Sequence, residues 1–158
     1  MPLEMGEYVR RAEELKGPLY RTAVLMLSNP SAAEEALDEA VYRGLTACGN
    51  LREPDHFRTW LTRILMNVCY NELQRQTREA PREILPEAAR EAFDALPLRQ
   101  AVERLPDPLR EIVILRYFTG YTLAETAEIL EIPPGTAATR QRRALQLLRK
   151  ALGEEDAE

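Results

Sequence analysis

The chain has 158 residues, is 45% hydrophobic and carries a net charge of −5 at pH 7. This length suits one larger domain or two small ones with real apolar cores, while the acidic balance argues against a free-standing protein that holds DNA mainly through phosphate contacts. The two isolated cysteines, Cys48 and Cys69, and the single histidine, His56, lack metal-ligand spacing, so neither a disulfide framework nor a metal site is expected. We find no signal peptide and no apolar run of transmembrane length, which predicts a soluble, cytoplasmic protein.

The N-terminal part of the sequence predicts two helices. A helical period covers residues 4–27, and Gly17-Pro18 is expected to interrupt or kink it. Ser31 and Glu34 form an S/T-x-x-E capping-box pattern, which predicts the start of a second helix that ends near Cys48.

This second helix carries a dense acidic patch made of Glu34, Glu35, Asp38 and Glu39. Acidic residues near a helix N-terminus favour the helix dipole, which is a sufficient structural explanation. The functional alternative is that the patch docks on a basic partner surface. The sequence leaves both explanations open.

A third helix is predicted from His56 to about Arg78, after a loop over residues 49–54 and with Asp55 as its N-cap. One apolar face is expected to be its core face: Phe57, Trp60, Leu61, Ile64 and Val68. A second, narrower stripe lies on the far side: Met66, Tyr70 and Leu73. A helix that is apolar on two sides usually packs on both, so the second stripe meets either another helix of the same domain, which we favour, or a partner protein.

A change in composition separates this helix from the rest of the chain. Residues 79–97 are rich in proline and acidic residues and are predicted to form an interdomain linker. Beyond it, Asp107 followed by Pro108 predicts an N-cap and first helical position, and this helix is expected to stop at Gly120.

The most informative stretch follows Gly120. Thr122 and Glu125 form a capping box, Pro133-Pro134 breaks the helix, and a second helix is predicted from Pro134 to Ala151. One side of that second helix is small and apolar except for Gln141, and consists of Ala137, Ala144 and Leu148. The opposite side is polar and consists of Thr139, Arg142, Arg143, Gln146 and Lys150.

From Thr139 to Ala151 there are five cationic side chains and no acidic one, in a chain that is acidic overall. A short helix, a sharp turn and a basic outward face match a helix-turn-helix, whose second helix enters the DNA major groove. The simpler alternative is a helical hairpin with a solvated basic face. The three features together favour binding of DNA.

These elements predict an all-α protein of two small helical domains: residues 1–78 and 98–152, joined by the acidic linker 79–97. The sequence contains no glycine-rich phosphate loop, no G-x-S-x-G and no H-E-x-x-H motif. We therefore expect neither an enzyme nor a bound cofactor.

The order of these parts resembles a bacterial RNA polymerase sigma factor of the sigma-70 family, in its small extracytoplasmic-function (ECF) group. The segment Phe57–Asn67 resembles the F-x-T-W-L-x-R-I-x-x-N run of region 2. The segments Leu105–Glu111 and Pro134–Arg140 resemble the region 4 pattern L-P-x-x-x-R-E … P-x-G-T-V-x-S-R, and Ala33–Glu39 is similar to the clamp-binding A-E-D-x-x-Q-E segment.

The resemblance implies that region 2 binds the polymerase clamp and melts the minus-ten element, while region 4 binds the minus-thirty-five element. It implies core RNA polymerase and promoter DNA as partners, and an anti-sigma factor as a further one. The expected DNA-binding residues of region 4 are Thr136, Ala138, Thr139, Arg140, Arg142, Arg143 and Lys150. Those of region 2 are Asn50, in a loop that captures a flipped-out base, and Arg63, Asn67, Asn71, Arg75 and Arg78. The expected polymerase-binding residues are Glu35, Asp38, Glu39 and Arg43.

The sequence departs from the family pattern at four positions. Asp38 precedes Glu39 where Gln is frequent, and Glu131 occupies the turn, where Gly accepts a positive φ easily. Ala138 stands where a cation often contacts DNA, and Gln141 replaces an apolar core residue. These departures predict an unusual minus-thirty-five preference and a less stable region 4.

Two alternatives remain at the level of sequence. A sigma-like decoy would bind an anti-sigma factor without binding DNA, and the acidity of residues 1–95, with 16 acidic and 12 basic side chains, supports it. A stand-alone helix-turn-helix regulator would leave residues 57–78 and the acidic linker unexplained.

Overall fold

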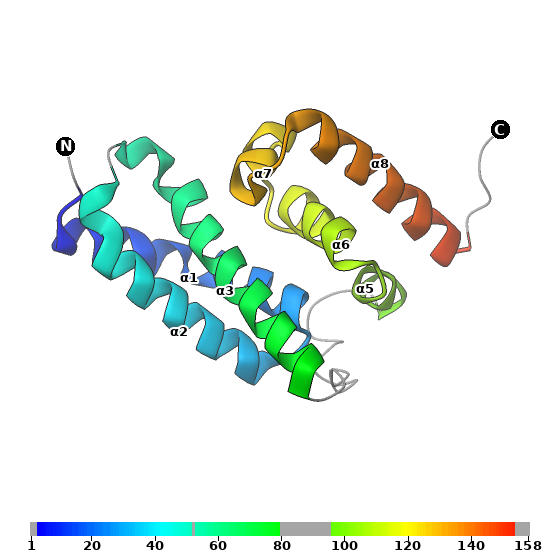
Figure 1. Ribbon diagram of the computed structural model, residues 1–158, viewed down its shortest axis with the longest axis horizontal. Helices are drawn as coiled ribbons and strands as arrows, with labels where there is room; N and C mark the ends of the chain where they lie inside the picture. The colour runs from blue at the N-terminus through cyan, green and yellow to red at the C-terminus, as the bar shows by residue number, and fades with distance from the viewer. Residues whose placement is uncertain (1–2, 52, 80–95, 154–158) are drawn as a thin grey trace. The chain divides into compact units, whose positions relative to one another are not determined.

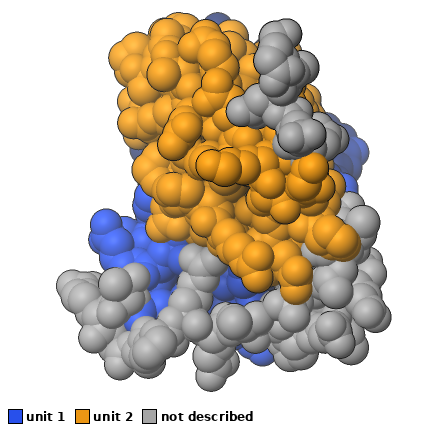
Figure 2. All heavy atoms as spheres, turned by 90° about the vertical axis from the view of Figure 1, so that its right-hand side faces the viewer, with its two compact units in different colours: residues 1–82 blue, residues 83–158 orange. Residues whose placement is uncertain are grey.

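The computed structural model describes residues 3–51, 53–79 and 96–153 (Figure 1). Within these ranges every regular element is a helix, which confirms the all-α fold class. The chain divides into two compact units, residues 1–82 and 83–158 (Figure 2). Residues 80–95, most of the predicted linker, lie outside the described part of the chain. None of the helices in the described ranges is long and apolar enough to cross a membrane.

The described residues of the first unit form three α-helices and two 3-10 turns: α1 (Met5–Leu27), α2 (Pro30–Ala47), η1 (Cys48–Asn50), η2 (Pro54–His56) and α3 (Phe57–Glu79). Each of the three α-helices packs against the other two. α1 is a single helix that includes Pro18, so Gly17-Pro18 does not interrupt it. Asp55 lies within η2, so its prediction as the N-cap of the third helix is wrong.

The start of α2 differs from the predicted one. Asn29 is the N-cap, its side-chain oxygen accepts a hydrogen bond from the amide of Ala32 at 3.1 Å, and Pro30 occupies the first turn. The predicted capping box at Ser31 is therefore wrong, because Asn29 caps the helix two residues earlier. The helix dipole acts most strongly on the first turn of a helix. Because α2 starts at Pro30, Glu34 lies beyond that turn. The dipole therefore explains little of the acidic patch.

Small residues on the buried face of α2 let α1 and α3 approach it closely: Ala33, Ala36, Ala40 and Gly44. The hydroxyl of Tyr8 on α1 donates a hydrogen bond to the carbonyl oxygen of Val41 at 2.7 Å. A methyl group at Gly44 would overlap this hydroxyl and lie 3.0 Å from Cδ1 of Leu61. Gly44 is thus needed for its small size.

We therefore expect Gly44→Ala to lower the free energy of unfolding by about 1–3 kcal/mol, the usual cost of overpacking a well-filled core. Urea denaturation followed by circular dichroism would measure this cost. Gly6→Ala is the matched control, because no atom lies within 4 Å of a Cβ there. Equal stability of Gly44→Ala and Gly6→Ala would contradict the packing at Gly44.

The buried face of α3 largely follows the predicted pattern. Phe57, Leu61 and Val68 are buried, and Trp60 and Ile64 are half-buried. Of the second stripe, Met66 and Leu73 are buried and Tyr70 is half-buried. Leu65 and Cys69, which the pattern did not single out, are also buried.

The second unit consists of α5 (Leu96–Glu103), α6 (Asp107–Val113), the π-helical turn η3 (Ile114–Phe118), α7 (Leu123–Leu130) and α8 (Pro134–Ala151). α8 packs against α5, α6 and α7. The core beneath it contains Ile112, Ala127 and Ala137, and partly buried side chains surround these: Leu123, Leu130 and Ile132.

The turn between α5 and α6 is held by Arg110, which is 1% exposed. Its guanidinium donates to the carboxylate of Asp107 at 2.6 Å and to the carbonyl oxygen of Leu105 at 3.3 Å. Asp107 lies inside the first turn of α6 and Pro106 is the N-cap, so the predicted N-cap role of Asp107 is wrong. Asp107 instead pairs with Arg110. The α-helix ends at Val113 and continues as the π-helical turn η3 to Phe118, so the helical segment stops two residues before Gly120, which has a φ of 89°.

The predicted capping box at the start of α7 is confirmed. The amide of Glu125 donates to the hydroxyl of Thr122 at 3.0 Å, and the amide of Thr122 donates to the carboxylate of Glu125 at 2.9 Å. At the other end of α7, Glu131 has φ 57° and ψ 46°, the left-handed conformation that glycine adopts easily. The left-handed conformation of Glu131 therefore costs roughly 1–2 kcal/mol of folding free energy relative to an unstrained backbone.

Candidate nucleic-acid and partner interfaces

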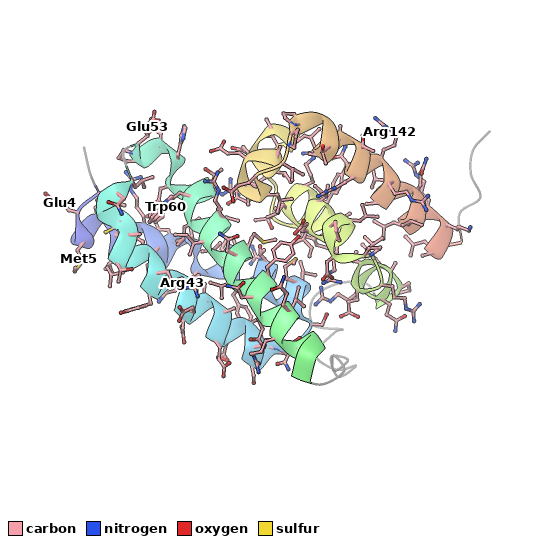
Figure 3. All side chains as sticks on the ribbon, in the orientation of Figure 1. Glu4, Met5, Arg43, Glu53, Trp60 and Arg142 are labelled. Atoms are coloured by element: carbon pink, nitrogen blue, oxygen red, sulfur yellow. The ribbon has the colours of Figure 1, made fainter. Side chains whose placement is uncertain are left out.

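The side of α8 that faces solvent forms the basic face, which we define as Thr139, Arg142, Arg143, Gln146 and Lys150. All five side chains are exposed, while Ala137, Ala144 and Leu148 on the opposite side are buried. Figure 3 shows Arg142 pointing away from α6. Because α8 contains no acidic residue, its cations are not neutralised within the helix.

The other three residues predicted on α8 are less accessible. Thr136, Ala138 and Arg140 are half-buried. They lie at the edges of the basic face, between it and the side that packs on the unit. The structure thus brings all seven predicted residues onto one helix but exposes only four of them fully.

Gln141, the polar residue on the apolar side of α8, has a partner that the sequence did not indicate. Its side-chain oxygen accepts a hydrogen bond from Nε of Arg116 at 2.8 Å. The same guanidinium donates to the carbonyl oxygen of Tyr121 at 2.9 Å and lies 5.3 Å from the ring centroid of Tyr117. Gln141 therefore ties α8 to η3, and it costs less stability than an unpaired amide would.

A second surface lies on α2, where Glu35, Asp38, Glu39 and Arg43 are all exposed. We call these four residues the α2 face. Nε of Arg43 lies 2.7 Å from the Glu39 carboxylate. Apart from this pair the face is acidic, which suits docking on a basic surface.

A shallow groove of about 310 Å³ separates the α2 face from α3. Glu35, Glu39 and Arg43 line one side, and Asn71 and Arg75 lie on the other. The guanidinium of Arg75 donates to the carboxylate of Glu72 at 2.6 Å, and this contact lowers the pKa of Glu72. The structure thus places two predicted DNA-binding residues beside the predicted polymerase-binding residues.

The remaining predicted residues of α3 do not all share that groove. Asn67 is exposed and Arg63 is half-buried, while the side chain of Arg78 lies outside the described residues. Residues four apart on a helix are offset by about 40°. The stripe from Arg63 to Arg75 therefore winds around α3, and its last members face α2.

The segment that joins η1 to η2 is held at both ends. Leu51 is buried, and on the far side Phe57 forms an aromatic cluster with Tyr8 and Trp60, with ring centroids 5.7 Å and 5.8 Å from that of Phe57. Asn50 directly precedes Leu51, while Glu53 lies between Leu51 and Phe57, and both are exposed. Figure 3 shows Glu53 at the tip of the connection. The anchored ends present Asn50 and Glu53 to solvent.

One residue near this segment was missed by the sequence patterns. Nη1 of Arg11, on α1, donates a hydrogen bond to the carbonyl oxygen of Pro54 at 2.8 Å. Nε of Arg11 lies 2.7 Å from the carboxylate of Glu7, and this bond, followed by the one from Arg10, lowers the pKa of Glu7. Because Pro54 is 43 positions away from Arg11, no local pattern could have indicated the contact.

Two family models match the chain. "Sigma-70 region 2" matches residues 12–79 and "Sigma-70, region 4" matches residues 95–148. Together they cover well over half of the chain, and each falls largely within one of the two units.

Curated relatives match along most of the chain. The RNA polymerase sigma factor SigV of Bacillus subtilis is 29% identical over 146 residues, with 89% of this chain and 88% of SigV covered. The ECF RNA polymerase sigma factor SigM of Mycobacterium tuberculosis is 33% identical over 140 residues, with 85% of this chain and 71% of SigM covered.

Solved structures share the fold at lower identity. The sigma factor RpoE of Bartonella quintana, in complex with the anti-sigma factor NepR, superposes with a TM-score of 0.82 at 20% identity, with 95% of this chain and 99% of RpoE covered. CnrH, in complex with the cytosolic domain of CnrY, gives a TM-score of 0.76 at 19% identity, with 94% of this chain and 89% of CnrH covered. With these matches on both units, the chain belongs to the sigma-70 family and is an ECF-type RNA polymerase sigma factor, a factor of transcription initiation.

Proposed function

We propose that the second unit binds the minus-thirty-five element of promoter DNA through the basic face of α8, while the first unit binds core polymerase and opens the minus-ten element. The observation that carries this proposal is the separation of α8 into a buried apolar side and an exposed cationic one. A recognition helix needs this arrangement, because one side must hold it on the domain while the other meets the groove.

Within the basic face, the position along α8 separates two kinds of contact. The N-terminal residues of a recognition helix contact base edges, and Thr139, Arg142 and Arg143 all lie nearer the N-terminus of α8 than Lys150 does. Lys150 lies in the last turn, which suits a phosphate contact. We therefore assign base recognition to the first group and electrostatic attraction to Lys150.

This assignment predicts that Arg143→Ala relaxes the choice of minus-thirty-five sequence. Losing one bidentate base contact costs about 1–3 kcal/mol of discrimination at one base position, which is roughly 5- to 150-fold. Transcription by the holoenzyme from a minus-thirty-five library would measure this loss.

Lys150→Ala is the matched control, because it removes the same charge from the same exposed face. It should weaken all promoters alike and make binding less sensitive to salt. If Arg143→Ala also weakens all promoters alike and leaves selectivity intact, then Arg143 contacts phosphate and the assignment is wrong.

The first unit carries the partner contacts in this proposal. The α2 face is exposed and mostly acidic, and it lies too far along α2 for the helix dipole to explain its charge. We assign it to the polymerase clamp. Asn71 and Arg75 share the groove beside it, so we assign them to the same contact and keep Asn50, Arg63 and Asn67 for the minus-ten DNA.

An anti-sigma factor is the second protein partner that we propose, because the sigma factor RpoE, which has the same fold, was solved in complex with an anti-sigma factor. Because bacterial core polymerase and DNA are in the cytoplasm, a protein with this function acts there. A decoy that does not bind DNA would not need the exposed cations of α8. The curated relatives are named as RNA polymerase sigma factors, which does not favour a decoy.

A further inference from the structure

Arg11 makes three contacts, of which two join α1 to the end of the η1–η2 connection and one lies within α1. Its guanidinium donates to the carbonyl oxygen of Pro54 at 2.8 Å and to the carboxylate of Glu7 at 2.7 Å, and it lies 5.8 Å from the ring centroid of Phe57. A fork of several donors can make these contacts together, which the single ammonium of lysine cannot do in the same geometry.

The neighbouring Arg10 shows that these contacts are specific to Arg11. Arg10 also pairs with Glu7, and with Glu14 at 3.5 Å, but its side chain is 59% exposed and both of these carboxylates lie on α1. Both arginines line a groove of about 360 Å³ together with Pro54 and Phe57. Of the two, Arg11 is the one bonded to the backbone of the connection.

We infer that Arg11 is a positioning residue for promoter opening, because it fixes the backbone at Pro54 and so orders the exposed residues Asn50 and Glu53 before DNA arrives. This inference rests on the proposed function, in which this connection captures an unstacked minus-ten base. Capture must return the energy spent on unstacking the base. Each residue that is already ordered removes part of the entropy cost of forming the captured state.

The test compares Arg11→Met, Arg11→Lys and the control Arg10→Met in complete holoenzyme. Permanganate reactivity of minus-ten thymines reports strand opening on duplex promoters. On promoters whose minus-ten segment is already mismatched, the affinity of the holoenzyme for templates that differ in the captured base reports discrimination. We expect Arg11→Met to reduce opening of the duplex about tenfold and to lower the preference for the correct captured base. Arg11→Lys should restore part of both, and Arg10→Met should behave like the wild type.

Pre-mismatched promoters separate positioning of the connection from unpairing of the duplex. Arg11→Met should still discriminate poorly among captured bases on these templates, because unpairing is already complete while the connection remains unordered. Discrimination equal to the wild type on mismatched templates would overturn the inference.

Two further outcomes distinguish failure of this inference from failure of the proposed function. If wild-type protein opens no promoter, the proposed function fails. If the wild type opens promoters and Arg11→Met opens them equally well, only the inference fails. A parallel loss of polymerase binding, helicity and opening in Arg11→Met would mean that Arg11 merely holds the unit together, which also overturns the inference.

Discussion

Replacing Asn50, Arg52, Glu53 and Asp55 by glycine and serine, while keeping Leu51 and Pro54, is expected to abolish promoter opening. These two residues are kept because Leu51 is buried and the Pro54 carbonyl is bonded to Arg11. Extruding a base costs a few kcal/mol, so losing the contacts that return this energy should reduce opening by roughly 100-fold. Permanganate footprinting of minus-ten thymines would measure the change.

The same variant should bind core polymerase as the wild type does, because the α2 face, which we assign to the polymerase, contains none of the replaced residues. Phe57 and Leu61 remain buried and keep the start of α3 in place. Opening at the wild-type level would show that this connection is not the base-capturing element. Loss of polymerase binding together with opening would place it in the protein interface instead.

Reversing two charges on the α2 face, Asp38→Lys with Glu39→Lys, is expected to weaken association with core polymerase by tenfold or more at low salt. Charges at an interface steer association and exclude mismatched surfaces, and salt screens this effect. The loss should therefore shrink as salt is raised. Fluorescence binding titrations at several salt concentrations would measure it.

Glu39→Lys also places a cation beside Arg43, in place of the present ion pair. Like charges four residues apart on a helix cost only about 0.2–0.5 kcal/mol, so circular dichroism should stay helical. Glu4→Lys with Glu13→Lys is the control, since it makes the same change in net charge at two exposed positions near and on α1. Unchanged affinity of the Asp38 and Glu39 variant would remove the α2 face from the polymerase interface.

Local patterns predicted the parts of this fold that depend on nearby residues. The capping box of Thr122 and Glu125 spans four residues, so its geometry follows from the sequence alone. The apolar side of α8 follows from helical periodicity in the same way. At the start of α2 the capping-box pattern at Ser31 was misleading, because Asn29 caps the helix two residues earlier.

Contacts between distant residues were beyond the sequence. Gln141 looked like a defect on an apolar face because its partner, Arg116, lies 25 positions away. The groove that gathers Asn71 and Arg75 with the α2 face depends on how α2 and α3 pack, which periodicity does not specify. The sequence therefore indicated which residues are candidates, while the structure shows which of them lie together.

The most direct test of promoter recognition by this chain is run-off transcription with bacterial core polymerase on a promoter library, with and without the protein. We expect transcripts that depend on the protein and come from templates sharing one minus-thirty-five and one minus-ten sequence, with permanganate-reactive thymines at the latter. Binding to core polymerase without transcripts or strand opening from any template would contradict this expectation and support the decoy.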